Sequence, residues 1–122
     1  MLTKQQIDKA KKEVRALDPH YEHDDCIRIA YEWLDAQKKT KNPRNVPHYL
    51  KHLIEQWAGR YVSQSDVEVA AHLHPLIKGK YPYYNISSRL TEPSTDRIKN
   101  IGEANTQGQR ESHKSSNYSI RE

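Results

Sequence analysis

The chain contains no phenylalanine, one cysteine and only four glycines among its 122 residues. The lone cysteine, Cys26, excludes an intramolecular disulfide, so a reducing cytoplasm is the compartment that we expect. No apolar stretch approaches the roughly 18 residues of a membrane-spanning helix, and the first residues carry no apolar run of the signal-peptide type. We therefore expect no membrane partner.

Large apolar side chains are also scarce, because hydrophobic residues make up 34% of the chain and charged residues 30%. That share suffices for one small core, so we expect a single domain. Without phenylalanine, the bulk of the core must come from Trp33, Trp57 and the aliphatic residues, with many of the eight tyrosines at its edge. The formal net charge of +4 permits a nucleic acid or an acidic protein partner and establishes neither.

Apolar residues recur at helical spacing in four segments, which predicts an all-α fold with four main helices. We expect these helices at residues 3–17, 24–38, 47–58 and 66–77. The second has the widest apolar band, which is typical of a central helix touched by several neighbours. Thr3 with Gln6 predicts an N-cap for the first helix and Gly59 a C-cap for the third, while Pro75 should end regular helix at Leu73 or His74.

The C-terminal third predicts only short elements. Asn85 is a good N-cap for a helix at 86–91, and Ser94 caps a last helical segment at 95–101. A tiny two-stranded wing is an open alternative, formed by residues 61–62 and 81–84. From residue 105 to 122 apolar residues almost vanish, which predicts a disordered tail after a domain that spans 1–104.

One stretch, VSQSDVEVAAHLHPLIKGKYPYYNISSRL at 62–90, organises the functional hypothesis. Ser65 and Glu68 have the spacing of a capping box at the start of a helix. A loop with Pro75, Gly79 and Pro82 follows, and then the helix that Asn85 would open. This order resembles a helix-turn-helix or winged-helix DNA-binding unit, which would extend over residues 62–101.

The resemblance implies a small DNA-binding or DNA-associated regulator. Lysines would attract phosphates, polar residues at the second helix start would meet phosphates or base edges, and tyrosines could stack on exposed bases. The expected interface consists of Lys78, Lys80, Tyr81, Tyr83, Tyr84, Asn85, Ser87, Ser88, Arg89, Arg97 and Lys99. The basic connection at 38–44 would assist through Lys39, Lys41 and Arg44.

Two other classes of function stay open. The same tyrosine-rich loop suits a protein–protein adaptor or inhibitor that contacts no nucleic acid, since Tyr and Arg are frequent in interface hot spots. The cluster from His20 to Cys26 is the one enzyme signal, that of a metal-dependent hydrolase, but its spacing secures no complete ligand set. The pairs His48/His52 and His72/His74 are no more specific, so we expect no metal, no cofactor and no catalytic residue.

Overall fold

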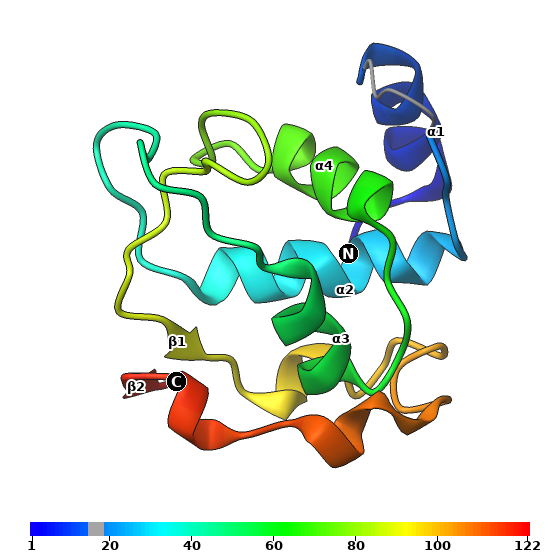
Figure 1. Ribbon diagram of the computed structural model, residues 1–122. Coiled ribbons are helices and arrows are strands. Elements are labelled where there is room, and N and C mark those ends of the chain that lie inside the picture. The colour runs from blue at the N-terminus through cyan, green and yellow to red at the C-terminus, as the bar shows by residue number, and fades with distance from the viewer. Residues whose placement is uncertain (15–18) are drawn as a thin grey trace.

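The computed structural model describes residues 1–14 and 19–122, and within them the chain is mostly helical (Figure 1). The α-helices are α1 Lys4–Glu13, α2 Asp24–Ala36, α3 Lys51–Ala58 and α4 Gln64–Leu73. Short elements follow in the order β1 Thr91–Glu92, η1 Thr95–Ile98, η2 Gly108–Ser112, η3 Ser115–Asn117 and β2 Ile120–Arg121. The predicted small helical domain with four main helices is confirmed. None of the helices in this part of the chain is both long and apolar enough to cross a membrane.

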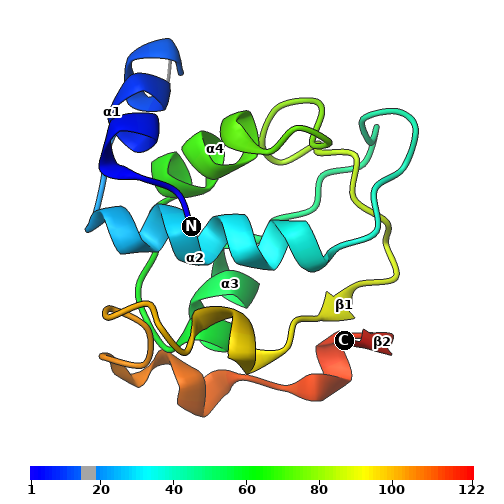
Figure 2. The same cartoon turned by 180° about the vertical axis from the view of Figure 1, so that it is seen from behind.

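Helix α2 is the centre of the fold, as its wide apolar band predicts. Figures 1 and 2 show it running across the molecule, with α4 on one side and α3 on the other. Trp33 of α2 and Trp57 of α3 are fully buried, and Cys26 is buried with them. Burial of large aromatic side chains of this kind contributes several kcal/mol each, roughly 3–5 for removal of a tryptophan.

Several helix ends follow from the residues predicted to make them. Thr3 and Gln6 form a reciprocal capping box at the start of α1. Gly59 closes α3 with a φ of 63°, a left-handed conformation that favours glycine. Helix α4 ends at Leu73, before Pro75. The predicted end of the first helix at Leu17 lies outside the described residues.

The capping box of α4 lies two residues before the predicted one. Ser63, not Ser65, is the N-cap: its hydroxyl accepts from the Asp66 amide at 3.0 Å, and the Asp66 carboxylate accepts from the Ser63 amide at 3.0 Å. The Ser65 hydroxyl instead accepts from the backbone amide of His20 at 3.1 Å. Both serines have an acid three residues later, so local spacing alone does not choose between them.

The predicted helix at 86–91 is wrong. Residues 86–90 are irregular and Thr91 begins β1. Ile86 pairs with Lys39 in an antiparallel bridge, and the Ser87 amide donates to the Lys38 carbonyl at 2.9 Å. Ile86 and Leu90 are both buried, so the apolar spacing that predicted a helix is used by an irregular segment. The predicted wing is also wrong, because residues 61–62 and 81–84 form no strand.

The only strand pair among the described residues joins β1 to the C-terminal β2 in parallel, with Thr91 opposite Ile120. Residues 105–122 therefore differ from the disordered tail predicted for them. They pass along α3 and return to β1 (Figure 1, orange to red). The Tyr118 hydroxyl accepts from the Trp33 indole at 3.0 Å, and Arg97 binds Glu122. Hydrogen bonds and one aromatic ring hold this segment, which apolar composition alone does not reveal.

Candidate nucleic-acid interface

Two loops that are far apart in sequence lie side by side at one end of the molecule, at the upper left of Figure 1. We call residues 37–50 and 74–90 the basic loop pair. Backbone hydrogen bonds cross between the loops: the Thr40 amide donates to the Asn85 carbonyl at 2.8 Å, and the Arg44 amide donates to the Tyr83 carbonyl at 3.0 Å. The two loops therefore form one hydrogen-bonded unit.

Asn85 is the side chain that fastens this unit. Its amide nitrogen donates to the carbonyls of Thr40 at 2.9 Å and Leu76 at 3.0 Å, and its side-chain oxygen accepts from the Lys78 amide at 2.6 Å. Asn85 is 1% exposed, so it neither caps a helix nor reaches a ligand. Its role is structural: it forms hydrogen bonds with partly buried backbone groups of both loops.

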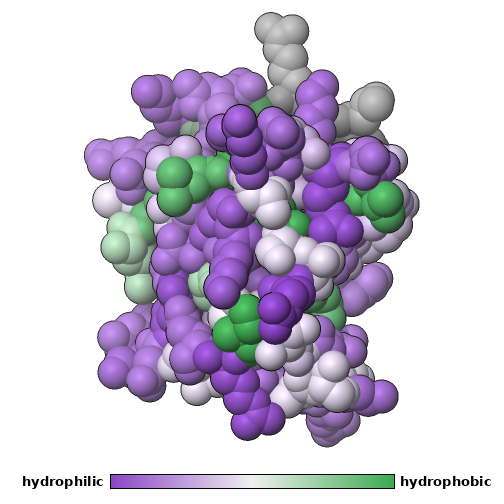
Figure 3. Space-filling model, turned by 90° about the vertical axis from the view of Figure 1, so that its left-hand side faces the viewer, coloured by the Kyte–Doolittle hydropathy of each residue, from purple (hydrophilic) through white to green (hydrophobic). Residues whose placement is uncertain are grey.

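The basic loop pair carries seven cationic side chains and no carboxylate. They are Lys38, Lys39, Lys41, Arg44, Lys78, Lys80 and Arg89. Since the whole chain has a net charge of only +4, the remainder of the molecule is net negative and the positive charge is concentrated here. Figure 3 views this side, and its surface is mostly hydrophilic with small, separate apolar patches.

Within residues 1–14 and 19–122, none of these seven cations forms an ion pair. Lys39 donates to the Asp35 carbonyl at 2.7 Å, and burial lowers the pKa of its ammonium. Arg44 donates to the carbonyls of Val46 and Ile86, so its guanidinium is oriented but not neutralised. His48 adds no charge at neutral pH, because burial and then Arg44 lower its pKa.

Arg97, which the sequence placed in the interface, has a different environment. Its guanidinium meets Glu122 at 2.6 Å, Asp35 at 2.9 Å and Glu32 at 3.1 Å. The hydrogen bond with Glu122 is the main reason that the pKa of Arg97 is raised. A phosphate would have to displace these carboxylates, so Arg97 is better described as the link between α2, η1 and the C-terminus.

The tyrosines of the second loop differ in how far they are exposed to solvent. Tyr84 is 4% exposed and part of the core, whereas Tyr83 is 41% exposed. Tyr81 is half-buried, and its hydroxyl accepts from the Lys51 amide at 3.3 Å. Tyr49, which the sequence reasoning missed, is 64% exposed and contacts Tyr81 with its ring at a centroid distance of 6.4 Å. Tyr83 and Tyr49 are thus the accessible rings.

The remaining predicted residues are on or near the surface. Ser88 and Arg89 are exposed, and the Ser87 hydroxyl accepts from the Arg89 amide at 3.2 Å. Lys99 is exposed directly after η1, which lies close to α3 in Figure 1 and away from the basic loop pair. The structure therefore brings together Lys78, Lys80 and Arg89 with the assisting cations of the first loop, and leaves Lys99 apart.

The histidine-rich stretch from His20 to Cys26 is dispersed among separate contacts. His20 meets Glu22 at 2.7 Å and Asp24 meets Lys11 at 3.0 Å. Cys26 points its thiol at the Tyr61 carbonyl, and burial raises its pKa to about 12. Across the described ranges, no group of three or more His, Cys, Asp or Glu residues is placed to hold a metal ion.

Comparisons with protein-family models, curated proteins and solved structures found no match to this chain. Function is therefore inferred from the residues and their geometry alone.

Proposed function

We propose that this protein binds nucleic acid through the phosphate backbone, using the basic loop pair as its contact surface. The observation that carries the proposal is the set of seven cations on two fastened loops. Neither loop contains a carboxylate, and none of the seven cations forms an ion pair with the described residues. Clustered, unpaired cations attract a polyanion at long range and release counterions when they bind it. The mode of contact is a rigid loop surface, because residues 86–91 form no helix that could enter a groove.

The helix-turn-helix resemblance stays a prediction, and the proposal does not depend on it. A regulatory or accessory role in the cytoplasm is the biological setting that we infer from the composition. Exposed Tyr83 and Tyr49 beside the cations favour single strands as well as duplexes, since unstacked bases can lie against aromatic rings.

Salt dependence is the direct test. If about four of the seven cations reach phosphates of a duplex, the logarithm of the binding constant should fall against the logarithm of salt concentration with a slope of about −3.6. The variant Lys41→Gln/Lys80→Gln should flatten that slope by about 1.8. The matched control is Lys9→Gln/Lys12→Gln, which removes the same charge from exposed positions of α1, at the other end of the molecule (Figure 1).

Labelled duplex and single-stranded DNA titrated at several salt concentrations give both slopes. Equal effects of the two double variants would show that only net charge matters. Absence of binding to either DNA in low salt would refute the proposal.

An acidic protein partner is the second candidate, that of an adaptor or inhibitor. It is favoured by four exposed apolar or aromatic residues on the same loops, Val46, Tyr49, Leu76 and Tyr83. An aromatic contact depends weakly on salt and would be lost in Tyr49→Ala, whereas phosphate contacts depend steeply on salt.

A further inference from the structure

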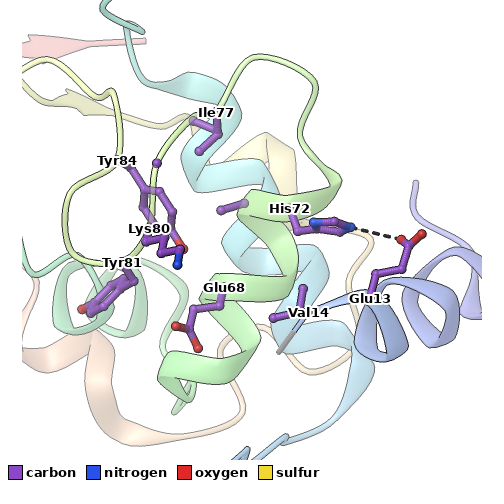
Figure 4. A pocket seen from close by; sticks show the side chains of 10 residues that line it. Glu13, Val14, Glu68, His72, Ile77, Lys80, Tyr81 and Tyr84 are labelled. Atoms are coloured by element: carbon purple, nitrogen blue, oxygen red, sulfur yellow. Dashed lines mark hydrogen bonds and ion pairs between the residues drawn. The ribbon is translucent and has the colours of Figure 1, made fainter. Parts of the chain in front are cut away.

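A cavity of about 400 Å³ lies beside the second loop of the basic loop pair, in the size range of small-molecule sites. Its walls come from α4, the C-terminal end of α1 and the loop at 77–84 (Figure 4). The residues that matter for its chemistry are Glu68, His72, Lys80, Tyr81 and Tyr84. It adjoins the proposed phosphate-binding surface through Lys80.

Two of the cavity's side chains are carboxylates, and they differ in their partners. Glu13 lies 3.0 Å from the His72 ring nitrogen, so it is already engaged. Glu68 accepts no hydrogen bond from residues 1–14 or 19–122, and Figure 4 shows its carboxylate extending from α4 on the side that faces Tyr81. The Glu68 charge also acts on the buried phenol of Tyr84: burial raises the pKa of Tyr84, and the Glu68 charge raises it further.

The opposite wall is aromatic and fixed. The rings of Tyr81 and Tyr84 lie 6.0 Å apart at 70°, and the Tyr81 hydroxyl is tied to the Lys51 amide. Lys80, between them and the solvent, is exposed. The cavity thus combines an open pair of carboxylate oxygens, flat apolar walls and an ammonium group on its outer side.

This arrangement is complementary to one class of ligand. The ligand must be flat, must present neighbouring N–H donors to Glu68, and must carry negative charge where Lys80 lies. We propose that the cavity binds the guanine base of a single-stranded nucleic acid, with Glu68 accepting from the guanine edge and Lys80 contacting its phosphate. This inference rests on the proposed function and adds a base preference to it.

Guanine is selected over the other bases by its donor pattern. It offers two adjacent donors, the ring N1–H and the 2-amino group, which match the two oxygens of one carboxylate. Adenine and cytosine place a single amino group next to a ring acceptor, which would face a carboxylate oxygen with repulsion. Thymine has one N–H between two carbonyl oxygens. A matched bidentate contact discriminates between bases by roughly 5–150-fold in affinity, which corresponds to about 1–3 kcal/mol.

The experiment compares labelled oligothymidylate with the same strand carrying one central guanine, adenine or hypoxanthine. We expect the guanine strand to bind about tenfold more tightly than the others, including hypoxanthine, which lacks the 2-amino group. Glu68→Gln should abolish this preference, so that this variant binds all four strands with equal affinity. The control Glu111→Gln removes an exposed carboxylate of η2 and should keep the preference.

The outcomes separate this inference from the proposed function. Salt-dependent binding of every strand with equal affinity would overturn the guanine site and leave the phosphate surface standing. If no strand binds, the proposed phosphate-binding surface is refuted. Binding of free guanosine monophosphate, followed by NMR, then tests the guanine site in the cavity separately. Guanosine monophosphate should then change the chemical shifts of His72 and the tyrosine rings. The guanine site is supported if adenosine monophosphate does not cause these changes and if they vanish in Glu68→Gln. Equal responses to both nucleotides, or none, would overturn it.

Discussion

The C-terminal segment at 105–122 should be required for full stability, although its sequence is almost devoid of apolar residues. Tyr118 is its main anchor: the ring lies 6.5 Å from the Trp33 ring and 5.9 Å from the His113 ring, and its hydroxyl accepts from the Trp33 indole. Replacing Tyr118 with alanine removes both kinds of contact. Replacing it with phenylalanine removes only the hydroxyl, so the pair separates hydrogen bonding from packing.

The magnitudes follow from the burial of Trp33, which is 0% exposed. An indole N–H left without its partner costs about 1–3 kcal/mol, and the aromatic contacts add about 0.5–1.5 kcal/mol. Tyr118→Ala should therefore lower the free energy of unfolding by about 1.5–4.5 kcal/mol, and Tyr118→Phe by about 1–3 kcal/mol. In a chain of this length each kcal/mol corresponds to about 4 °C in Tm, so the expected shifts are roughly 6–18 °C and 4–12 °C.

Thermal and urea unfolding followed by tryptophan fluorescence measure these shifts, with exposed Ser116→Ala as the control that should melt like the parent. Deletion of residues 105–122 should cost more than Tyr118→Ala, because Arg97 also loses Glu122 and the Ala58 carbonyl loses the Asn105 amide at 2.7 Å. A truncated chain with an unchanged Tm would refute the whole account of this segment and restore the prediction of a dispensable tail.

Three further predictions concern single positions. Asn85→Ala should destabilise the protein by about 1–3 kcal/mol, measured by urea unfolding, because two partly buried carbonyls and the Lys78 amide lose a buried side-chain partner. Gly59→Ala should destabilise it while Gly108→Ala does not, since a Cβ at Gly59 would lie 2.8 Å from Asn105 Oδ1 at a φ of 63° and one at Gly108 meets nothing; equal Tm values would contradict this. Burial raises the pKa of Cys26 from 9.0 to about 12, so the unfolded thiol loses its proton first and stability should fall between these pH values; a Cys26→Ala chain should show a smaller fall, since buried tyrosines with raised pKa values contribute the rest.

The four helices could be predicted because each has an apolar stripe long enough to outweigh local alternatives. Their ends were predictable where one residue decides them, as at Thr3 and Gly59. The start of α4 was not, because Ser63 and Ser65 both precede an acid by three residues. What separates them is tertiary: the His20 amide takes the Ser65 hydroxyl as its acceptor.

The failures at 86–91 and 105–122 have a common physical cause. Both segments make backbone hydrogen bonds to residues distant in sequence: Ser87 donates to Lys38 in one and Ser119 donates to Leu90 in the other. Helical periodicity is a property of the local sequence and carries no information on distant partners. Low apolar content indicates disorder only when no distant segment supplies hydrogen bonds. Tyr118 was the one available signal, as a single large ring in a polar segment.

The candidate interface was predictable in its cations and not in its polar residues. Lys78, Lys80 and Arg89 are exposed, as charged residues usually are. The burial of Asn85, in contrast, depends on whether another segment of the chain packs against it. Buried asparagine that braces two loops and asparagine that caps a helix look identical in sequence. The assisting cations Lys39, Lys41 and Arg44 were predicted from the sequence, and the hydrogen bond from Asn85 to Thr40 shows how their loop at 37–50 is held against the second loop.

The distribution of carboxylates is the strongest reason to separate structural from functional cations. Arg28 meets Asp25 of its own helix at 2.6 Å, whereas Arg60 and Arg97 meet carboxylates of distant segments at 3.1 and 2.6 Å. The cations of the basic loop pair meet none in the part of the chain that the structure describes, although the chain has 16 acidic residues to supply partners. Their mutual repulsion opposes folding, and the hydrogen bonds of Asn85 hold them together against it. A fold that keeps such a surface unneutralised is suited to a partner that brings the negative charge.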